Sequence, residues 1–155
     1  MLRLITLSIA ASASLFAQGA TAQARAEHAA ACVAALRVDA DAMAEQLRRG
    51  RAEVEPELRR RLQEGFAFIG TAYKQGLREA DANRLLKDAE QAQLALPPRQ
   101  LAERQVACRA EGARLLAGAN VVEQALVERA ADRRIQKFKR SRESRGSAGA
   151  SATAS

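Results

Sequence analysis

Apolar residues recur at steps of three and four along most of this chain, and this spacing restricts the secondary structure that it can form. One such series is Leu58, Leu62, Phe66, Ile69, Tyr73 and Leu77. This spacing places the side chains on one face of an α-helix. Residues that favour helix dominate the sequence, β-branched residues are sparse, and no stretch alternates as a strand would. We therefore predict an all-α protein.

Glycine and proline divide the helical pattern into four segments. The first runs from about residue 24 to 49 and ends at Gly50. The second begins near Pro56, which suits the first turn of a helix, and ends at Gly76, a candidate C-cap. A third segment ends at the proline pair of residues 97–98, which also starts the fourth. Short connections favour antiparallel neighbours, so we expect an up-down-up-down four-helix bundle with coiled-coil-like packing.

The fourth segment is too long for such a bundle. Its helical pattern persists to about Lys139, roughly 20 residues beyond the height of the other helices. We expect either one long C-terminal helix or a break near Gly118 that starts a short fifth helix. Asn120 and Glu123 have the spacing of a capping box there. Residues 141–155 have no apolar stripe to bury and are predicted to form a disordered tail.

The first 22 residues have the layout of a secretory signal peptide. Arg3 precedes an apolar run that is too short to span a bilayer, and small residues follow it. Ala20 and Ala22 form the cleavage pattern, so the exported chain would begin at Gln23. We predict a periplasmic or secreted protein without a transmembrane segment after cleavage, organised as a signal peptide (1–22), a helical bundle domain (23–140) and a tail (141–155).

The only histidine, His28, stands four residues before the first of two cysteines, Cys32 and Cys108. In the expected bundle both cysteines lie at the same level, about 25 Å from one end, and in an oxidising compartment such a pair forms a disulfide. A metal site would have only these three good ligands and would compete with oxidation. A nucleophilic cysteine would lack an orienting group, and a lipid anchor at Cys32 would leave Cys108 unpartnered. We predict the disulfide, no metal and no cofactor, with His28 as a surface residue.

The formal net charge of +7 comes mainly from arginine. For an exported protein such a charge indicates attraction to an anionic envelope surface or an acidic protein. The chain has no tryptophan and few other aromatic residues, which argues against nucleic acid as a partner. Carboxylates beside arginines, as in "ELRRRLQE", are interpreted as ion pairs on exposed helix faces.

The last segment combines an apolar stripe with basic residues. The inward series Leu115, Ala119, Val122 and Leu126 gives way to a second stripe, Val127, Ala131, Ile135 and Phe138. Basic residues lie on the side of the helix opposite this second stripe, a pattern typical of a basic amphipathic helix. Our candidate surface for an anionic partner is Arg129, Arg133, Arg134, Lys137, Lys139 and Arg140. Alternatively, the second stripe covers the end of the bundle or pairs with a second copy in a homodimer.

These features favour a non-catalytic structural or interaction module of the cell envelope. No residue stands out as catalytic, because no phosphate-binding glycine loop and no haem or di-iron motif is present. Two alternatives stay open. One is an unrecognised enzyme. The other is a small-ligand carrier, whose apolar slot would be framed by Gly65, Phe66, Phe68, Gly70 and Tyr73, with the two glycines admitting a close neighbour.

Overall fold

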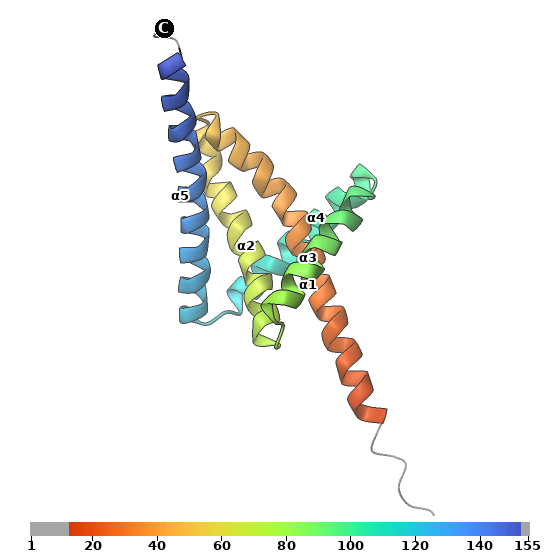
Figure 1. Cartoon of the computed structure of the whole chain (residues 1–155). Helices are drawn as coiled ribbons and strands as arrows, with labels where there is room; N and C mark the ends of the chain where they lie inside the picture. Colours follow the sequence, from red (N-terminus) through yellow and green to blue (C-terminus); the bar gives the residue numbers. More distant parts are fainter. Residues whose placement is uncertain (1–12, 153–155) are drawn as a thin grey trace, which may run out of the picture.

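The computed structural model describes residues 13–152, with side chains from residue 21 to 141 (Figure 1). Within that range all regular secondary structure is helical, so the predicted all-α bundle is confirmed. The elements are α1 (Ala13–Arg48), a short 3₁₀ turn (Ala52–Val54), α2 (Glu55–Lys74), α3 (Glu79–Leu94), α4 (Pro98–Ala117) and α5 (Val121–Ala152).

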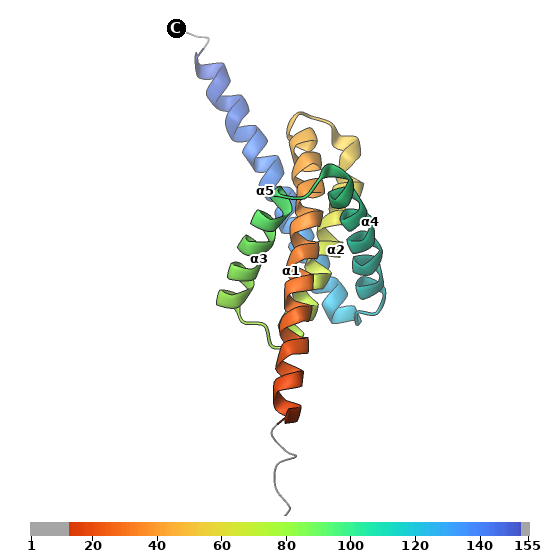
Figure 2. The same ribbon diagram turned by 90° about the vertical axis from the view of Figure 1, so that its right-hand side faces the viewer.

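Successive helices alternate in direction, and α1 and α2 form the centre of the bundle (Figures 1 and 2). Helix α4 packs on both α1 and α2, and α5 packs on the same two helices. Helix α3 lies against α1 on the side away from α4 (Figure 2). The fifth helix is therefore a member of the bundle and not an extension of it.

Helices α1 and α2 end at the two glycines that the sequence singled out. Gly50 and Gly76 have φ angles of +93° and +92°, which side chains other than glycine rarely adopt. At the second, the amide of Gly76 donates to the carbonyl of Tyr73, and the amide of Leu77 donates to that of Ala72. This pair of bonds is a Schellman motif, which satisfies carbonyls that the helix leaves free.

The break between α4 and α5 follows the predicted capping box. The Oδ1 atom of Asn120 accepts a hydrogen bond from the Glu123 amide at 3.0 Å, and Glu123 Oε2 accepts one from the Asn120 amide at 3.1 Å. Lys74, in the last turn of α2, pairs with Glu123 at 2.7 Å and lowers the pKa of that carboxyl. The chain therefore breaks near Gly118, as one of the two alternatives held, but the fifth helix is 32 residues long and not short.

The apolar stripe of α5 lies inside the bundle. Ala131 and Ile135 are fully buried, and Phe138 is nearly so. Ile135 and Phe138 pack with Leu47 of α1 and Leu58 of α2 in one core cluster. The stripe thus covers α1 and α2, as one of our interpretations held, and it is not free to pair with a second copy.

Three details of the prediction were wrong. Val122 and Leu126 do not point inward but are 69% and 56% exposed, because the turn before α5 redirects the helix. Tyr73 of α2 is also partly exposed, at 45%. The buried face of α2 is rotated from the predicted one because three helices, α1, α4 and α5, cover it. It carries Leu58, Arg61, Glu64, Ala67, Phe68 and Ala72.

The two ends of the chain bear on the predicted signal peptide and tail. Residues 1–12 lie outside the described part, and the predicted cleavage point before Gln23 falls within α1, so the signal peptide stays a prediction. Helix α5 continues to Ala152, past the boundary near residue 140 where we predicted that order ends. Residues 153–155 lie outside the described range.

Candidate functional site

Cys32 of α1 and Cys108 of α4 form a disulfide, as predicted. Their Cα atoms are 5.2 Å apart, and both residues are buried. Leu36 and Phe68 pack against them in a second core cluster. The bond joins the first helix to the fourth, so it closes most of the bundle into one covalent loop.

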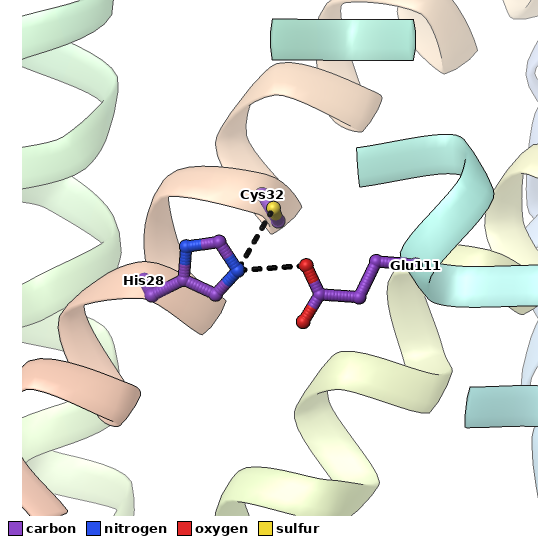
Figure 3. A group of neighbouring side chains, drawn as sticks. All are labelled: His28, Cys32 and Glu111. Atoms are coloured by element: carbon purple, nitrogen blue, oxygen red, sulfur yellow. Dashed lines mark hydrogen bonds and ion pairs between the residues drawn. The ribbon is translucent and has the colours of Figure 1, made fainter. Parts of the chain in front are cut away.

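His28 and Glu111 meet beside the Cys32 half of this disulfide (Figure 3). Nε2 of His28 lies 2.8 Å from Oε2 of Glu111 and 3.9 Å from Sγ of Cys32. The histidine side chain is 57% exposed and that of Glu111 is 36% exposed, whereas the sulfur is covered. His28 is thus at the surface, as predicted, but it is not isolated, because its Nε2 faces a carboxylate and a sulfur.

Glu111 is the site residue that sequence reasoning missed. His28 lies one turn before Cys32 on α1, and Glu111 lies one turn after Cys108 on α4. Since α1 and α4 run in opposite directions, these two steps lead to the same side of the disulfide (Figure 2). The spacing of His28 from Cys32 and of Glu111 from Cys108 could have predicted this pair, but only if the two helices were known to be antiparallel neighbours.

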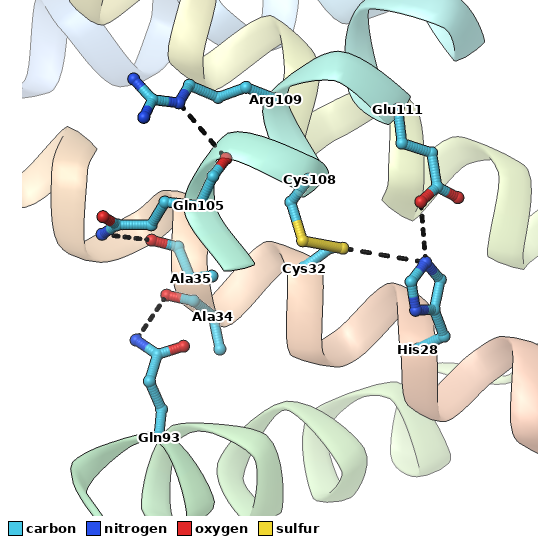
Figure 4. The surroundings of a disulfide bond; sticks show 9 residues. All are labelled: His28, Cys32, Ala34, Ala35, Gln93, Gln105, Cys108, Arg109 and Glu111. Carbon is cyan, nitrogen blue, oxygen red and sulfur yellow. Dashed lines mark hydrogen bonds and ion pairs between the residues drawn. A yellow bond between two sulfur atoms is a disulfide. The ribbon is translucent and has the colours of Figure 1, made fainter. Parts of the chain in front are cut away.

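Two glutamines fix the neighbouring helices on α1 around the disulfide (Figure 4). Gln93 of α3 donates from Nε2 to the carbonyl of Ala34 at 3.2 Å, and Gln105 of α4 donates to that of Ala35 at 3.3 Å. Because these carbonyls follow Cys32 by two and three residues, the backbone around the bridge is held from both sides.

A second polar group lies in the interior. Arg61 of α2 is buried and pairs with Glu57 and Glu64 of its own helix and with Asp39 of α1, the last at 3.6 Å. Burial raises the pKa of the Glu64 carboxyl, against the opposing effect of Arg61. The interpretation of "ELRRRLQE" as exposed ion pairs is therefore wrong for Arg61 and Glu64. These residues face inward because α2 is rotated under α4.

Glycine permits the close packing of α4 on α2 at this point. A Cβ atom on Gly112 would lie 2.8 Å from the Cβ of Glu64 and 3.1 Å from its carbonyl oxygen. Gly65 and Gly70, which we expected to admit a close neighbour, would each place a Cβ atom in open space. The close approach thus belongs to α4, where Gly112 is buried.

The exposed face of α5 carries a row of four basic residues. Arg129, Arg133, Lys137 and Arg140 follow each other at steps of four, four and three, and all are exposed. No ion pair joins any of the four to a carboxylate among the side chains that the structure describes. Val122 and Leu126 continue the same face toward the start of the helix.

Two members of the predicted anionic-partner surface lie elsewhere. Arg134 turns toward the bundle, with its guanidinium 5.0 Å from the centre of the Phe138 ring. Lys139 pairs with Glu55 of α2 at 2.7 Å and holds the pKa of that carboxyl below its usual value. The structure therefore divides the six predicted residues into four that face outward, Arg134, which lies over Phe138 of its own helix, and Lys139, which pairs α5 with α2.

The residues proposed to frame a carrier slot do not line one hollow. Phe68 and Tyr73 border a small hollow between α1, α2 and α3 of about 130 Å³. Gly65 and Phe66 border a different one, beside α1 and Phe138, and Gly70 faces a third, beside α4 and the start of α5. These side chains therefore do not converge on a common ligand.

No known protein family, curated protein or solved structure matches this chain. Across the described residues, none of the helices combines the length and the apolar character needed to cross a bilayer.

Proposed function

We propose that this chain is an exported, non-catalytic module of the cell envelope that docks on an anionic membrane surface through the exposed face of α5. The observation that carries the proposal is the outward row Arg129, Arg133, Lys137 and Arg140, which has no carboxylate partner among the described side chains. Export is supported by the signal-peptide pattern and by the disulfide, which belongs to oxidising compartments.

A straight helix presents such a row to a flat surface. The four basic residues span roughly 16 Å at the rise of an α-helix, a length over which a layer of head groups offers several phosphates at once. A basic residue near an anionic leaflet contributes about 1 kcal/mol. The row as a whole would therefore strengthen membrane partitioning by about 4 kcal/mol, or roughly 1,000-fold.

The binding would rest on charge and not on insertion. The apolar stripe of α5 is occupied by α1 and α2, so the bundle cannot offer it to lipid without opening its core. Val122 and Leu126 add a small exposed apolar area at one end of the row. Since charges at a surface are screened within about 8 Å at physiological ionic strength, added salt should weaken the interaction steeply.

The test is co-sedimentation of the full chain with vesicles of phosphatidylglycerol and, separately, of phosphatidylcholine, over a series of salt concentrations. The informative variant replaces the four outward residues of α5 by glutamine. Its control replaces four exposed basic residues elsewhere, which removes the same charge but leaves the row in place: Arg25, Arg78, Lys87 and Arg114. Truncation after residue 120 is unsuitable, because it would expose Leu47 and Leu58.

We expect binding to phosphatidylglycerol that falls with salt, with a loss of about 100-fold or more in the α5 variant and a much smaller loss in the control. Equal losses in the two variants would mean that net charge alone attracts the protein, which would remove the proposed docking face. Absence of binding to anionic vesicles at low salt would refute the membrane as partner and leave an acidic protein as the alternative.

A further inference from the structure

We infer that the reduced protein binds a zinc-like divalent metal ion through Cys32, Cys108, His28 and Glu111. The donor atoms of His28, Cys32 and Glu111 already lie within 4.8 Å of one another, and the sulfur of Cys108 is bonded to that of Cys32. Two thiolates, an imidazole and a carboxylate are all ligands that zinc accepts in a tetrahedral site. The intact disulfide offers no thiolate, so this site exists only after reduction.

The spacing of the donors fits the size of a zinc site. Zinc bonds of 2.0 to 2.3 Å place neighbouring ligand atoms about 3.3 to 3.8 Å apart in a tetrahedron. The observed separations from Nε2 of His28 are 3.9 Å to Sγ of Cys32 and 2.8 Å to Oε2 of Glu111 (Figure 3). The first distance is about 0.1 Å above this range and the second is about 0.5 Å below it, while the donor atoms of Cys32 and Glu111 lie within 4.8 Å of each other. Metal binding therefore requires the two sulfurs to separate and the exposed Glu111 side chain to shift by up to about 1 Å.

The redox step balances with a dithiol as the reductant. The dithiol gives two electrons and two protons to the disulfide and itself becomes a disulfide, while Cys32 and Cys108 become thiols. The metal ion then replaces both thiol protons, which pass to solvent. The 2.8 Å hydrogen bond between Nε2 of His28 and Glu111 holds a proton, which passes to solvent when the metal binds these two atoms. The neutral imidazole then binds through Nε2 and carries its proton on Nδ1. Reoxidation by a disulfide reverses these steps and releases the ion.

The metal has a path to the sulfurs. His28 and Glu111 are partly exposed and lie between solvent and the buried Cys32. An ion captured by the imidazole and the carboxylate therefore meets the thiolates next. The bridge between α1 and α4 would persist in either state, as a covalent bond in the oxidised protein and as coordination in the reduced one.

The experiment is a titration of the full chain with Co²⁺, followed by competition with Zn²⁺. The protein is reduced with a dithiol, and the dithiol is then removed under anaerobic conditions. Tetrahedral cobalt is identified by its visible bands, and thiolate ligation by its near-ultraviolet charge-transfer band. The variants are His28→Ala and Glu111→Ala. Glu103→Ala is the matched control, since Glu103 is also an exposed, ion-paired glutamate of α4.

We expect reduced wild-type protein and Glu103→Ala to bind one cobalt ion with a thiolate band, and the oxidised protein to show no such band. His28→Ala and Glu111→Ala should bind at least about 100-fold more weakly, since each removes a ligand. If the reduced chain loses helix without metal, Zn²⁺ should restore its circular dichroism in the wild type but not in His28→Ala. A reduced wild type without the thiolate band, or variants that bind as tightly as wild type, would overturn the proposal.

Discussion

Gly112 makes the sharpest test of how α4 packs on α2. In Gly112→Ala the new methyl group would lie 2.8 Å from the Cβ of Glu64, and 3.1 and 3.2 Å from its carbonyl oxygen and Cα. Carbon atoms pack best at about 3.5 to 4.0 Å. Two of these three atoms belong to the backbone of α2, so no rotamer change can relieve the contact and α4 must move away.

The expected change in stability follows from two opposing effects. Overpacking of a well-filled core costs about 1 to 3 kcal/mol, while alanine in place of glycine stabilises a helix interior by up to about 1 kcal/mol. Gly112→Ala should therefore lower the free energy of unfolding by about 1 to 2 kcal/mol and the melting temperature by roughly 2 to 8 °C. Thermal and urea unfolding of the oxidised protein, followed by far-ultraviolet circular dichroism, measures both.

Gly65 and Gly70 supply matched controls in the interior of α2. A Cβ atom at either position meets nothing within 4 Å. Gly65→Ala and Gly70→Ala should therefore each stabilise the protein by about 0.5 to 1 kcal/mol, through helix propensity alone. The same substitution thus has opposite signs on two packed helices. If Gly112→Ala were as stable as wild type, or if both controls were destabilised, the packing described for α2 and α4 would be incorrect.

Three further predictions concern stability. Replacing both cysteines by alanine should lower the free energy of unfolding by up to about 4.5 kcal/mol in urea titrations, because the disulfide spans 76 positions of the sequence. Burial raises the pKa of Glu64 in the folded state above its value in the unfolded chain. The contribution of Glu64 to stability is therefore complete below the unfolded-state pKa and is lost as the pH rises through the folded-state pKa. Glu64→Gln should therefore flatten that decline in unfolding free energies measured across pH, and an unchanged profile would contradict the assignment. Asn120→Ala removes the cap of α5 and should cost about 1 kcal/mol in thermal unfolding, whereas no loss would mean that the cap is replaced by water.

The helix ends were predictable because their causes are local. The end of α2 is closed by hydrogen bonds from the amide of Gly76 to Tyr73 and from that of Leu77 to Ala72, and Asn120 and Glu123 cap α5 across three positions. The cysteine pairing was also predictable, since helix lengths and alternating direction place Cys32 and Cys108 at one level. In each case the segment between the interacting groups is helical or a short turn, so its geometry is known in advance.

Which face of each helix is buried was less predictable. Leu58, Leu62 and Phe66 form a regular apolar series, yet Arg61 and Glu64 occupy the interior between α1, α2 and α4. The apolar series marks one favourable face, but α2 touches three helices and has little exposed surface left. The pair of Arg61 and Glu64 is buried there although desolvation outweighs the effect of Arg61 on the pKa of Glu64, and no property of the sequence pattern reveals it.

The helical class, the ends of α1 and α2, the cap of α5 and the disulfide were all predictable from the residues alone. All of these depend on hydrogen bonds within a few residues or on a fixed rise per residue. Three features depend on how the helices pack: α5 completes the core, Gly112 and not Gly65 is the point of close contact, and Glu111 lies beside His28 and Cys32. Helix packing depends on many weak contacts between side chains of different helices. A local sequence pattern therefore does not predict which two helices will pack together.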